Sequence, residues 1–226
     1  MATYLKYNRY WWLGFEIMSS VSQLRRTQDQ QLLLNLIARS EGGLKPKGKI
    51  DMQSDRVTLE ISLPTVANTH YPNEAQASCT IEIQLPIRYP FAPPSAKVLS
   101  PQWHPNVWPN GTICLGTRWQ ASEGLDLFVA RIVKLLIYDP LLVNLGSMAH
   151  PDAGRWYSQT LKIHPSTFPT VQTHAGHWLR DPRGVNQPLA KVEKSCPHCN
   201  ATLRLPSGRS GVVQCPKCRG DFEVST

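Results

Sequence analysis

Two stretches of this sequence alternate between apolar and polar residues, and they constrain the fold more than any other feature. Successive side chains of a β-strand point to opposite faces of a sheet, so strict alternation predicts a strand with one buried face. Residues 55–64 and 77–86 both alternate in this way, and shorter runs at 47–53 and 95–99 predict two further strands. Together they predict a four-stranded antiparallel meander with one apolar face. The alternating apolar positions are Val57, Leu59, Ile61 and Leu63, then Cys79, Ile81, Ile83 and Leu85.

Helical spacing appears on both sides of the predicted strands. Residues 19–39 place apolar side chains three and four positions apart, with Ser19 and Ser20 as candidate N-terminal caps. Residues 125–139 carry a second apolar stripe, which predicts a helix packed against the sheet. Its polar positions are expected to face away from the core, and they are Asp126, Arg131 and Lys134.

The composition agrees with a folded core and a smaller module. The chain has 226 residues, 41% of them hydrophobic, and a net charge of +8 that is concentrated after residue 153. This excess is better explained by a solvated linker than by nucleic-acid binding, so nucleic acid is not expected as a partner. The first eighteen residues are rich in aromatic side chains but lack the apolar run of a signal peptide, and no membrane partner is expected.

Four of the six cysteines form two pairs near the end of the chain. Fifteen residues separate the pair Cys196 and Cys199 from the pair Cys215 and Cys218, a spacing that brings two thiolate pairs to one tetrahedral centre. These four residues are the predicted ligands of one structural Zn²⁺, and His198 is not needed as a ligand. Redox use of the two pairs is the alternative. Because the remaining cysteines need no disulfide partner, a reducing compartment, the cytoplasm, is expected.

The stretch HPNVWPNGTICLG, residues 104–116, places Cys114 directly after a turn formed by Pro109, Asn110 and Gly111. A turn at this point favours an exposed shelf over a strand interior. A cysteine there can accept an acyl group and later release it, since thiolate is both a strong nucleophile and a good leaving group. Cys79, in contrast, lies on the apolar side of its predicted strand and is expected to be a core residue.

The order of these motifs resembles the ubiquitin-conjugating enzyme family. The resemblance runs from residue 19 to residue 158 and includes the YPFAPP loop (89–94), HPNV, the ICL that contains Cys114, and a helix that ends in Asp139-Pro140. It implies an α+β fold: an N-terminal helix, the four-stranded antiparallel meander and C-terminal helices, followed by a small zinc ribbon. The implied domains are a catalytic domain at 1–158, a linker or extended arm at 159–193 and the ribbon at 194–226.

The resemblance also implies an activity. An activating enzyme would pass a ubiquitin-like modifier to Cys114 as a thioester, and the modifier would then move to an amine on a target protein. Asn106 could donate its side-chain amide either to a developing oxyanion or to the loop that frames the site. His104 is expected to be a structural hydrogen-bonding residue rather than a general base. Where members often have an acidic residue near the attacking lysine, this chain offers Asn144 or Ser147.

Other features concern partners and departures from the family pattern. Phe91 matches a position that contacts ligases, although packing under its own prolines is an equal alternative, and Arg25 and Arg26 resemble residues that meet the activating enzyme. The loop after Cys114 is short, because the expected tryptophan is Trp119. These departures and the zinc module also resemble bacterial conjugating-enzyme-like proteins, some of them linked to phage defence. The alternative to an enzyme is a non-catalytic binding module that recruits partners through the ribbon.

Overall fold

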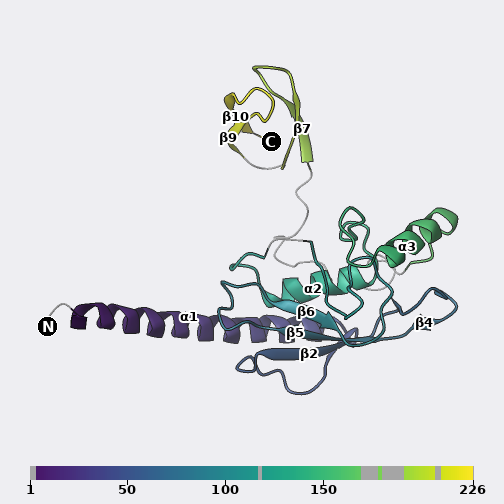
Figure 1. The fold of residues 1–226 in the computed structure, drawn as a ribbon, viewed down its shortest axis with the longest axis horizontal. Helices are drawn as coiled ribbons and strands as arrows, with labels where there is room; N and C mark the ends of the chain where they lie inside the picture. Colours follow the sequence, from purple (N-terminus) through teal and green to yellow (C-terminus); the bar gives the residue numbers. More distant parts are fainter. Residues whose placement is uncertain (1–3, 117–118, 169–177, 180–190, 207–209, 226) are drawn as a thin grey trace. The chain divides into compact units, whose positions relative to one another are not determined.

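A computed structural model describes residues 4–116, 119–168, 178–179, 191–206 and 210–225, and for residues 4–20 it describes the backbone alone. The chain divides into two compact units, Met1–Arg180 and Asp181–Thr226. Each unit is described by itself below. Figure 1 shows the first unit as a sheet with helices and the second as a small set of strands.

The first unit is built on a four-stranded antiparallel sheet (Figure 1). Its strands lie in the order β1-β2-β5-β6, so the chain meanders as the alternation predicts. Ile61 pairs with Cys79 between the two long strands, and Ile81 pairs with Val98 at the next ladder. The strands are β1 (Leu44–Pro46), β2 (Arg56–Ile61), β5 (Cys79–Gln84) and β6 (Ser95–Val98).

The apolar face of this sheet forms the main core. Every second residue of β2 and β5 is buried, while the residues between them are only partly buried or exposed. Helix α1 (Tyr4–Arg39) contributes Leu33 and Leu36 to the same core. Helix α2 (Leu125–Leu136) is buried over almost its whole surface. The α+β meander with flanking helices is therefore confirmed.

Three details differ from the sequence-based expectations. Helix α1 begins at Tyr4, so Ser19 and Ser20 lie inside it and do not cap it; no proline precedes them to stop the helix. Residues 47–53 form a loop, because Gly48 adopts a φ of +98° and a turn follows, yet Ile50 and Met52 are still buried. The expectation that Asp126 faces away from the core is wrong, since its side chain is buried.

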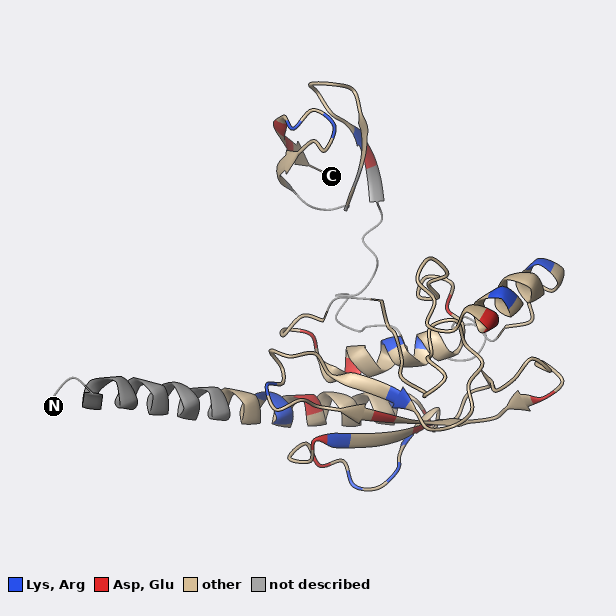
Figure 2. Ribbon diagram, in the orientation of Figure 1, with Lys and Arg blue, Asp and Glu red and all other residues tan. Residues whose placement is uncertain are grey.

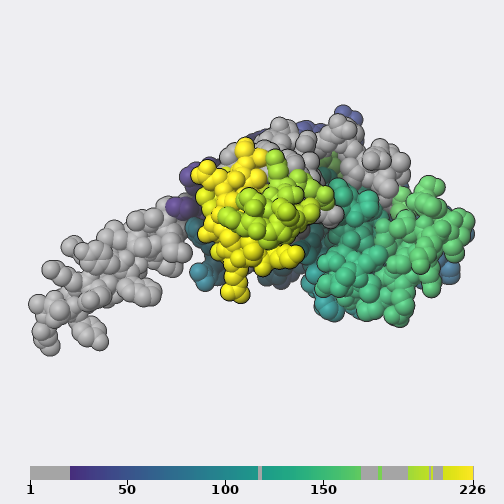
Figure 3. Space-filling view, turned by 90° about the horizontal axis from the view of Figure 1, so that it is seen from above, coloured from purple at the N-terminus to yellow at the C-terminus, as the bar shows by residue number. Residues whose placement is uncertain are grey.

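The chain after α2 packs against a second, aromatic cluster. His150 is the N-terminal cap of helix α3 (Pro151–Ile163), and its ring Nδ1 accepts a hydrogen bond from the backbone N–H of Ala153. Phe168 packs between Tyr138 and Tyr157 of this cluster, with ring centroids 4.7 Å from each. In Figure 3 the green surface of α3 continues into the teal surface of the loops that precede it.

Two described residues of the segment predicted as a linker or extended arm belong to the main core of the first unit. Trp178 and Leu179 are buried in the main core, and the Trp178 ring lies 3.1 Å from where a Cβ on Gly43 would be. A side chain at position 43 would therefore make an unusually tight contact with this ring. The predicted domain boundaries themselves stay a prediction.

Two antiparallel pairs of strands form the second unit. Strand β7 pairs with β8, and β9 pairs with β10. The strands are β7 (Lys191–Ser195), β8 (Thr202–Pro206), β9 (Ser210–Gln214) and β10 (Asp221–Ser225).

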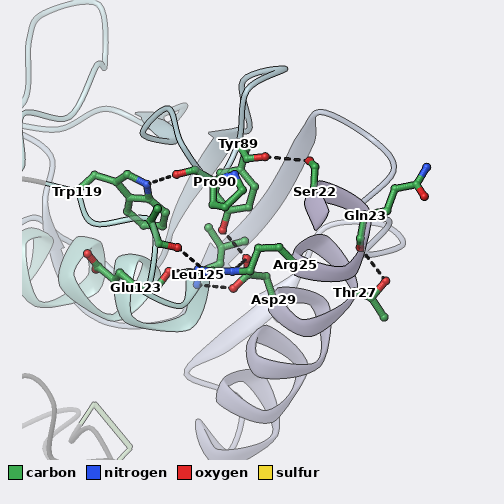
Figure 4. A network of polar contacts seen from close by, with 11 residues as sticks. Ser22, Gln23, Arg25, Thr27, Asp29, Tyr89, Pro90, Trp119, Glu123 and Leu125 are labelled. Atoms are coloured by element: carbon green, nitrogen blue, oxygen red, sulfur yellow. Dashed lines mark hydrogen bonds and ion pairs between the residues drawn. The ribbon is translucent and has the colours of Figure 1, made fainter. Parts of the chain in front are cut away.

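A buried carboxylate joins three elements of the first unit. Asp29 of α1 is completely buried, and its Oδ1 accepts a hydrogen bond of 2.9 Å from the backbone N–H of Leu125, where α2 begins. Its Oδ2 accepts from the Arg25 Nε at 2.6 Å and from the Tyr89 hydroxyl at 2.5 Å (Figure 4). Burial and the neighbouring carboxylate raise the pKa of Tyr89, so the phenol stays protonated and acts as the donor.

We expect Asp29→Ala to lower the free energy of unfolding of the first unit by about 3 kcal/mol, because it leaves a guanidinium, a phenol and a helix N-terminus without their shared acceptor. Urea denaturation followed by tryptophan fluorescence measures the change. Asp55→Ala is the control: its carboxylate is largely exposed and pairs with Arg26 at 3.4 Å, so its loss should cost less than about 1 kcal/mol. Equal costs for the two variants would contradict the role of Asp29.

Candidate active site

Cys114 lies in a short extended segment between the edge of the sheet and the HPN loop. The Ile113 backbone donates to the Ala96 carbonyl of β6 at 3.0 Å, and the Cys114 backbone donates to the Asn106 carbonyl at 2.8 Å. The turn before it depends on Gly111, which has a φ of +86° and would place a Cβ 2.3 Å from the Val98 carbonyl oxygen. The predicted turn therefore fixes the cysteine against β6.

The two isolated cysteines of this unit differ in their surroundings. Cys114 is partly exposed and forms no disulfide. Cys79 is almost fully buried, and this burial raises the pKa of its thiol to about 12, so it remains a neutral core residue. Of these two thiols, Cys114 is the one that another molecule can approach.

The His104 ring is buried and has both nitrogens occupied. Its Nδ1 accepts from the Asn106 backbone N–H at 3.0 Å, so the proton lies on Nε2, which donates to the Leu135 carbonyl at 2.9 Å. Desolvation lowers the pKa of His104 to about 3. The ring is therefore neutral at physiological pH and connects the HPN loop to α2, which agrees with a structural role and not with a general base.

The side chain of Asn106 makes a two-bond lock with the backbone of Asn144. Its Nδ2 donates to the Asn144 carbonyl, and its Oδ1 accepts from the Asn144 N–H, both at 2.9 Å. The side chain of Asn106 is only 1% exposed. Of the two functions considered for Asn106, this geometry matches the support of a framing loop.

Asn144 itself is exposed, and its side chain bonds within its own loop. Its Oδ1 accepts from the backbone of Gly146 at 2.9 Å and of Ser147 at 3.2 Å. Its Nδ2 lies 3.6 Å from where a Cβ on Gly116 would be. The residue predicted to assist the transfer is therefore placed beside the segment that follows Cys114.

The segment around Cys114 also borders an open groove of about 400 Å³. Phe91 lines the groove and is 56% exposed, so it offers its ring to solvent. Trp119 also lines it, and its indole N–H donates to the Pro90 carbonyl at 2.7 Å. Trp119 thus holds the YPF loop, although the chain between it and Cys114 is short.

Intramolecular bonds occupy the two arginines predicted to meet an activating enzyme. Besides Asp29, Arg25 donates to the backbone carbonyls of Ala121 and Glu123 (Figure 4). Arg26 is only 8% exposed and donates to the Met52 carbonyl at 2.8 Å. These contacts give both residues a structural role, and contact with an activating enzyme stays a prediction.

The four paired cysteines of the second unit converge on one point. Their Sγ atoms all lie within 4.8 Å of one another. The Sγ atoms of Cys196 and Cys218 are 3.7 Å apart, and so are those of Cys199 and Cys215. A tetrahedral zinc ion with Zn–S bonds of about 2.3 Å requires sulfur atoms about 3.8 Å apart. The arrangement therefore fits a four-thiolate metal site. His198 lies outside it, with its Nε2 3.2 Å from the Asp221 carbonyl oxygen.

Comparison with known proteins assigns the first unit to a family. Residues 38–162 match the model of the ubiquitin-conjugating enzyme family, which is more than half of the chain. The chain therefore belongs to the ubiquitin-conjugating enzyme family. It is 24% identical to the structure of human ubiquitin-conjugating enzyme E2 G1, with a TM-score of 0.39, covering 49% of this chain and 92% of that one.

Three relatives illustrate the range of similarity. Ubiquitin-conjugating enzyme E2 T of Danio rerio is 30% identical over 141 residues, which cover 58% of this chain and 67% of that protein. Ubiquitin-conjugating enzyme E2 2 of Mycosarcoma maydis is 36% identical over 96 residues, covering 41% and 49%. The enzyme E2 of African swine fever virus (strain Badajoz 1971 Vero-adapted) is 30% identical over 87 residues, covering 34% and 39%. The chain thus spans less than half the length of the fungal and viral proteins.

The burial of Asp29 was not predicted, although the sequence carries a signal for it. Counting by helical spacing along α1, Asp29 falls on the same stripe as Leu33 and Leu36. A carboxylate on an apolar stripe indicates a buried polar contact. The same reading applies to Arg26, which lies one turn before it.

Within the described residues, no helix has the length and apolar character needed to cross a membrane.

The lowered pKa of His104 predicts that acid destabilises the first unit. The unfolded chain binds a proton near pH 6.5, whereas the folded ring resists protonation down to about pH 3, so stability from the neutral ring is present above pH 6.5 and is lost as the pH falls below it. Between pH 7 and pH 5, wild type should lose about 2 kcal/mol more unfolding free energy than His104→Gln. Urea titrations at both pH values measure this difference, and parallel losses would refute it.

Proposed function

We propose that the first unit accepts a ubiquitin-like modifier from an activating enzyme as a thioester on Cys114 and transfers it to an amine on a target protein. The observation that carries this proposal is the position of Cys114: it is a partly exposed, free thiol fixed beside the locked pair of Asn106 and Asn144. Membership of the ubiquitin-conjugating enzyme family supports the same reaction.

The chemistry of the proposal is the exchange of one acyl bond for another. The Cys114 thiolate attacks the thioester that joins the modifier to the activating enzyme, the old carbon–sulfur bond breaks, and the enzyme's thiolate leaves. An amine of the target then attacks the new thioester, an amide bond forms, and the Cys114 thiolate leaves. The proton that the amine loses passes to solvent and not to the buried, neutral ring of His104, because both nitrogens of that ring are already bonded.

The proposed partners follow from the reaction. The activating enzyme, the modifier and the target protein are required, and a ligase would use the exposed ring of Phe91 beside the groove. Lysine and arginine are interspersed with acidic residues over the first unit (Figure 2), which does not favour a nucleic-acid surface there. The relatives named above come from a fish, a fungus and a virus, so a bacterial defence pathway stays a prediction, as does the cytoplasm.

We also propose that the four cysteines of the second unit hold one structural Zn²⁺. The described apolar core of this unit is small, consisting of Leu203 with Leu205, Phe222 and Ala201 around the cysteines. A core of this size supplies little folding energy, which a four-thiolate metal would provide. Four protein ligands leave no open coordination position, so the ion would support structure and not catalysis.

The proposed thioester predicts a specific adduct. Incubation with ubiquitin, its activating enzyme and ATP should give a product about 8.5 kDa heavier that thiols cleave, since a thioester exchanges with free thiol. Cys114→Ala should abolish this product, and Cys114→Ser should give an ester that resists thiols but is cleaved by hydroxide. Non-reducing gels and mass spectrometry measure both. Cys79→Ala is the control and should retain the adduct; an adduct that survives in Cys114→Ala would contradict the proposal.

The proposed metal site predicts one equivalent of zinc per chain by elemental analysis. Removing the ion with a chelator, or replacing Cys196 by Ser, should make the second unit sensitive to protease because its remaining core is too small to fold. Thioester formation in the first unit should persist. A metal-free second unit that resists protease as well as the metal-bound one would show that the site is not structural.

A further inference from the structure

The Asn106 amide is not free to assist a reaction. Its Nδ2 and Oδ1 are both bonded to the Asn144 backbone, and the side chain is almost fully buried. To reach a thioester on Cys114, it would have to break both bonds and turn toward the surface. Its side chain instead holds the backbone of Asn144 in one position. The backbone carbonyl of the same Asn106 accepts a hydrogen bond from the Cys114 N–H, so Asn106 connects the Asn144 loop to the segment that carries Cys114.

The Asn144 side-chain oxygen and nitrogen differ in how far their hydrogen-bonding capacity is used. An amide oxygen has two lone pairs, and those of its Oδ1 receive the backbone N–H groups of Gly146 and Ser147. Its Nδ2 has two N–H donors, and neither bonds to any residue within the described part of the chain. The amide is therefore held by its oxygen and presents only hydrogen-bond donors.

Gly116 gives these donors access to the site. It has a φ of +64°, and a Cβ on it would lie 3.6 Å from the Asn144 Nδ2. The donors therefore approach the backbone two residues after Cys114, on a surface where Gly116 is exposed and Cys114 partly exposed. Because residue 116 is a glycine, it places no side chain against the Asn144 Nδ2.

We infer that Asn144 Nδ2 donates a hydrogen bond to the carbonyl oxygen of the thioester on Cys114 and stabilises the oxyanion that forms during transfer; this inference rests on the proposed function. When the amine attacks, the carbon–nitrogen bond forms and the carbonyl electrons move to oxygen. The oxyanion then collapses, the carbon–sulfur bond breaks, the Cys114 thiolate leaves, and solvent takes the proton of the amine. A preorganised donor lowers the barrier because it is aimed where the negative charge develops.

The donor assignment excludes a different function for the same residue. An amide oxygen with both lone pairs in use cannot accept a proton or a hydrogen bond from the attacking amine. An amide nitrogen cannot act as a base. Asn144 therefore acts on the acyl group and not on the amine, in contrast to a carboxylate at this position, which would act on the amine.

The test compares two substitutions of Asn144. Asp has the same shape and keeps an oxygen for the N–H groups of Gly146 and Ser147, but it replaces the Nδ2 donors by an acceptor. Ala removes the oxygen as well. Wild type and both variants are charged with ubiquitin on Cys114, the activating enzyme is then stopped, and the loss of thioester is followed in excess free lysine from pH 7 to pH 9. Leu141→Gln, at an exposed position of the same loop, is the control.

We expect both Asn144→Asp and Asn144→Ala to reach the wild-type level of thioester and then to transfer about 100-fold more slowly, the cost of losing one oxyanion donor. Their rates should rise with pH in parallel with wild type, because Asn144 does not titrate. Leu141→Gln should transfer at the wild-type rate.

Three outcomes would overturn the inference. A wild-type rate for Asn144→Asp with a slow Asn144→Ala would mean that only the loop-holding oxygen matters. A faster Asn144→Asp with a shallower pH dependence would mean that the position acts on the amine. Wild-type rates for both variants would mean that Asn144 has no part in transfer. Absence of a thioester on wild-type Cys114 would instead refute the proposed function itself.

Discussion

The carboxylate of Asp29 is the contact on which the first unit depends. It is fully buried and bonds to Arg25 of its own helix, to the hydroxyl of Tyr89, the first residue of the YPFAPP loop, and to the backbone where α2 begins (Figure 4). Hydrophobic burial holds helices against a sheet without fixing their direction, whereas hydrogen bonds to one charged group fix three elements relative to one another. The orientation of α2 in turn fixes the Leu135 carbonyl that holds His104.

Rigidity at the candidate site is built from the same kind of contact. His104 connects the HPN loop to α2, and Asn106 connects the same loop to the backbone of Asn144. Cys114 is held by the Asn106 carbonyl. The residues that define the HPN motif therefore form the support of the site. Among the described residues that frame the site, the partly exposed Cys114 and the exposed Asn144 are the ones that the proposed reaction uses.

Much of this arrangement could be predicted from the sequence. The alternation of β2 and β5, the turn at Gly111 and the spacing of the four cysteines depend on neighbouring residues, and local geometry decides them. The strand expected at 47–53 was wrong because alternating burial of Ile50 and Met52 occurs there without a strand partner. Asp126 was misplaced because helical spacing identifies the most apolar face but does not show that α2 is surrounded on nearly all sides.

The sequence by itself determined the order of elements, the cysteine proposed to react and the set of thiolates that could share a metal, since periodicity and short spacings encode all three. Only the tertiary structure decided which polar groups remain free. Asn106 bonds to the backbone of a residue 38 positions away, and the side-chain N–H groups of Asn144 have no partner among the described residues. Hydrogen-bonding capacity is consumed by whichever partner lies closest in space, and separation along the chain does not reveal that partner.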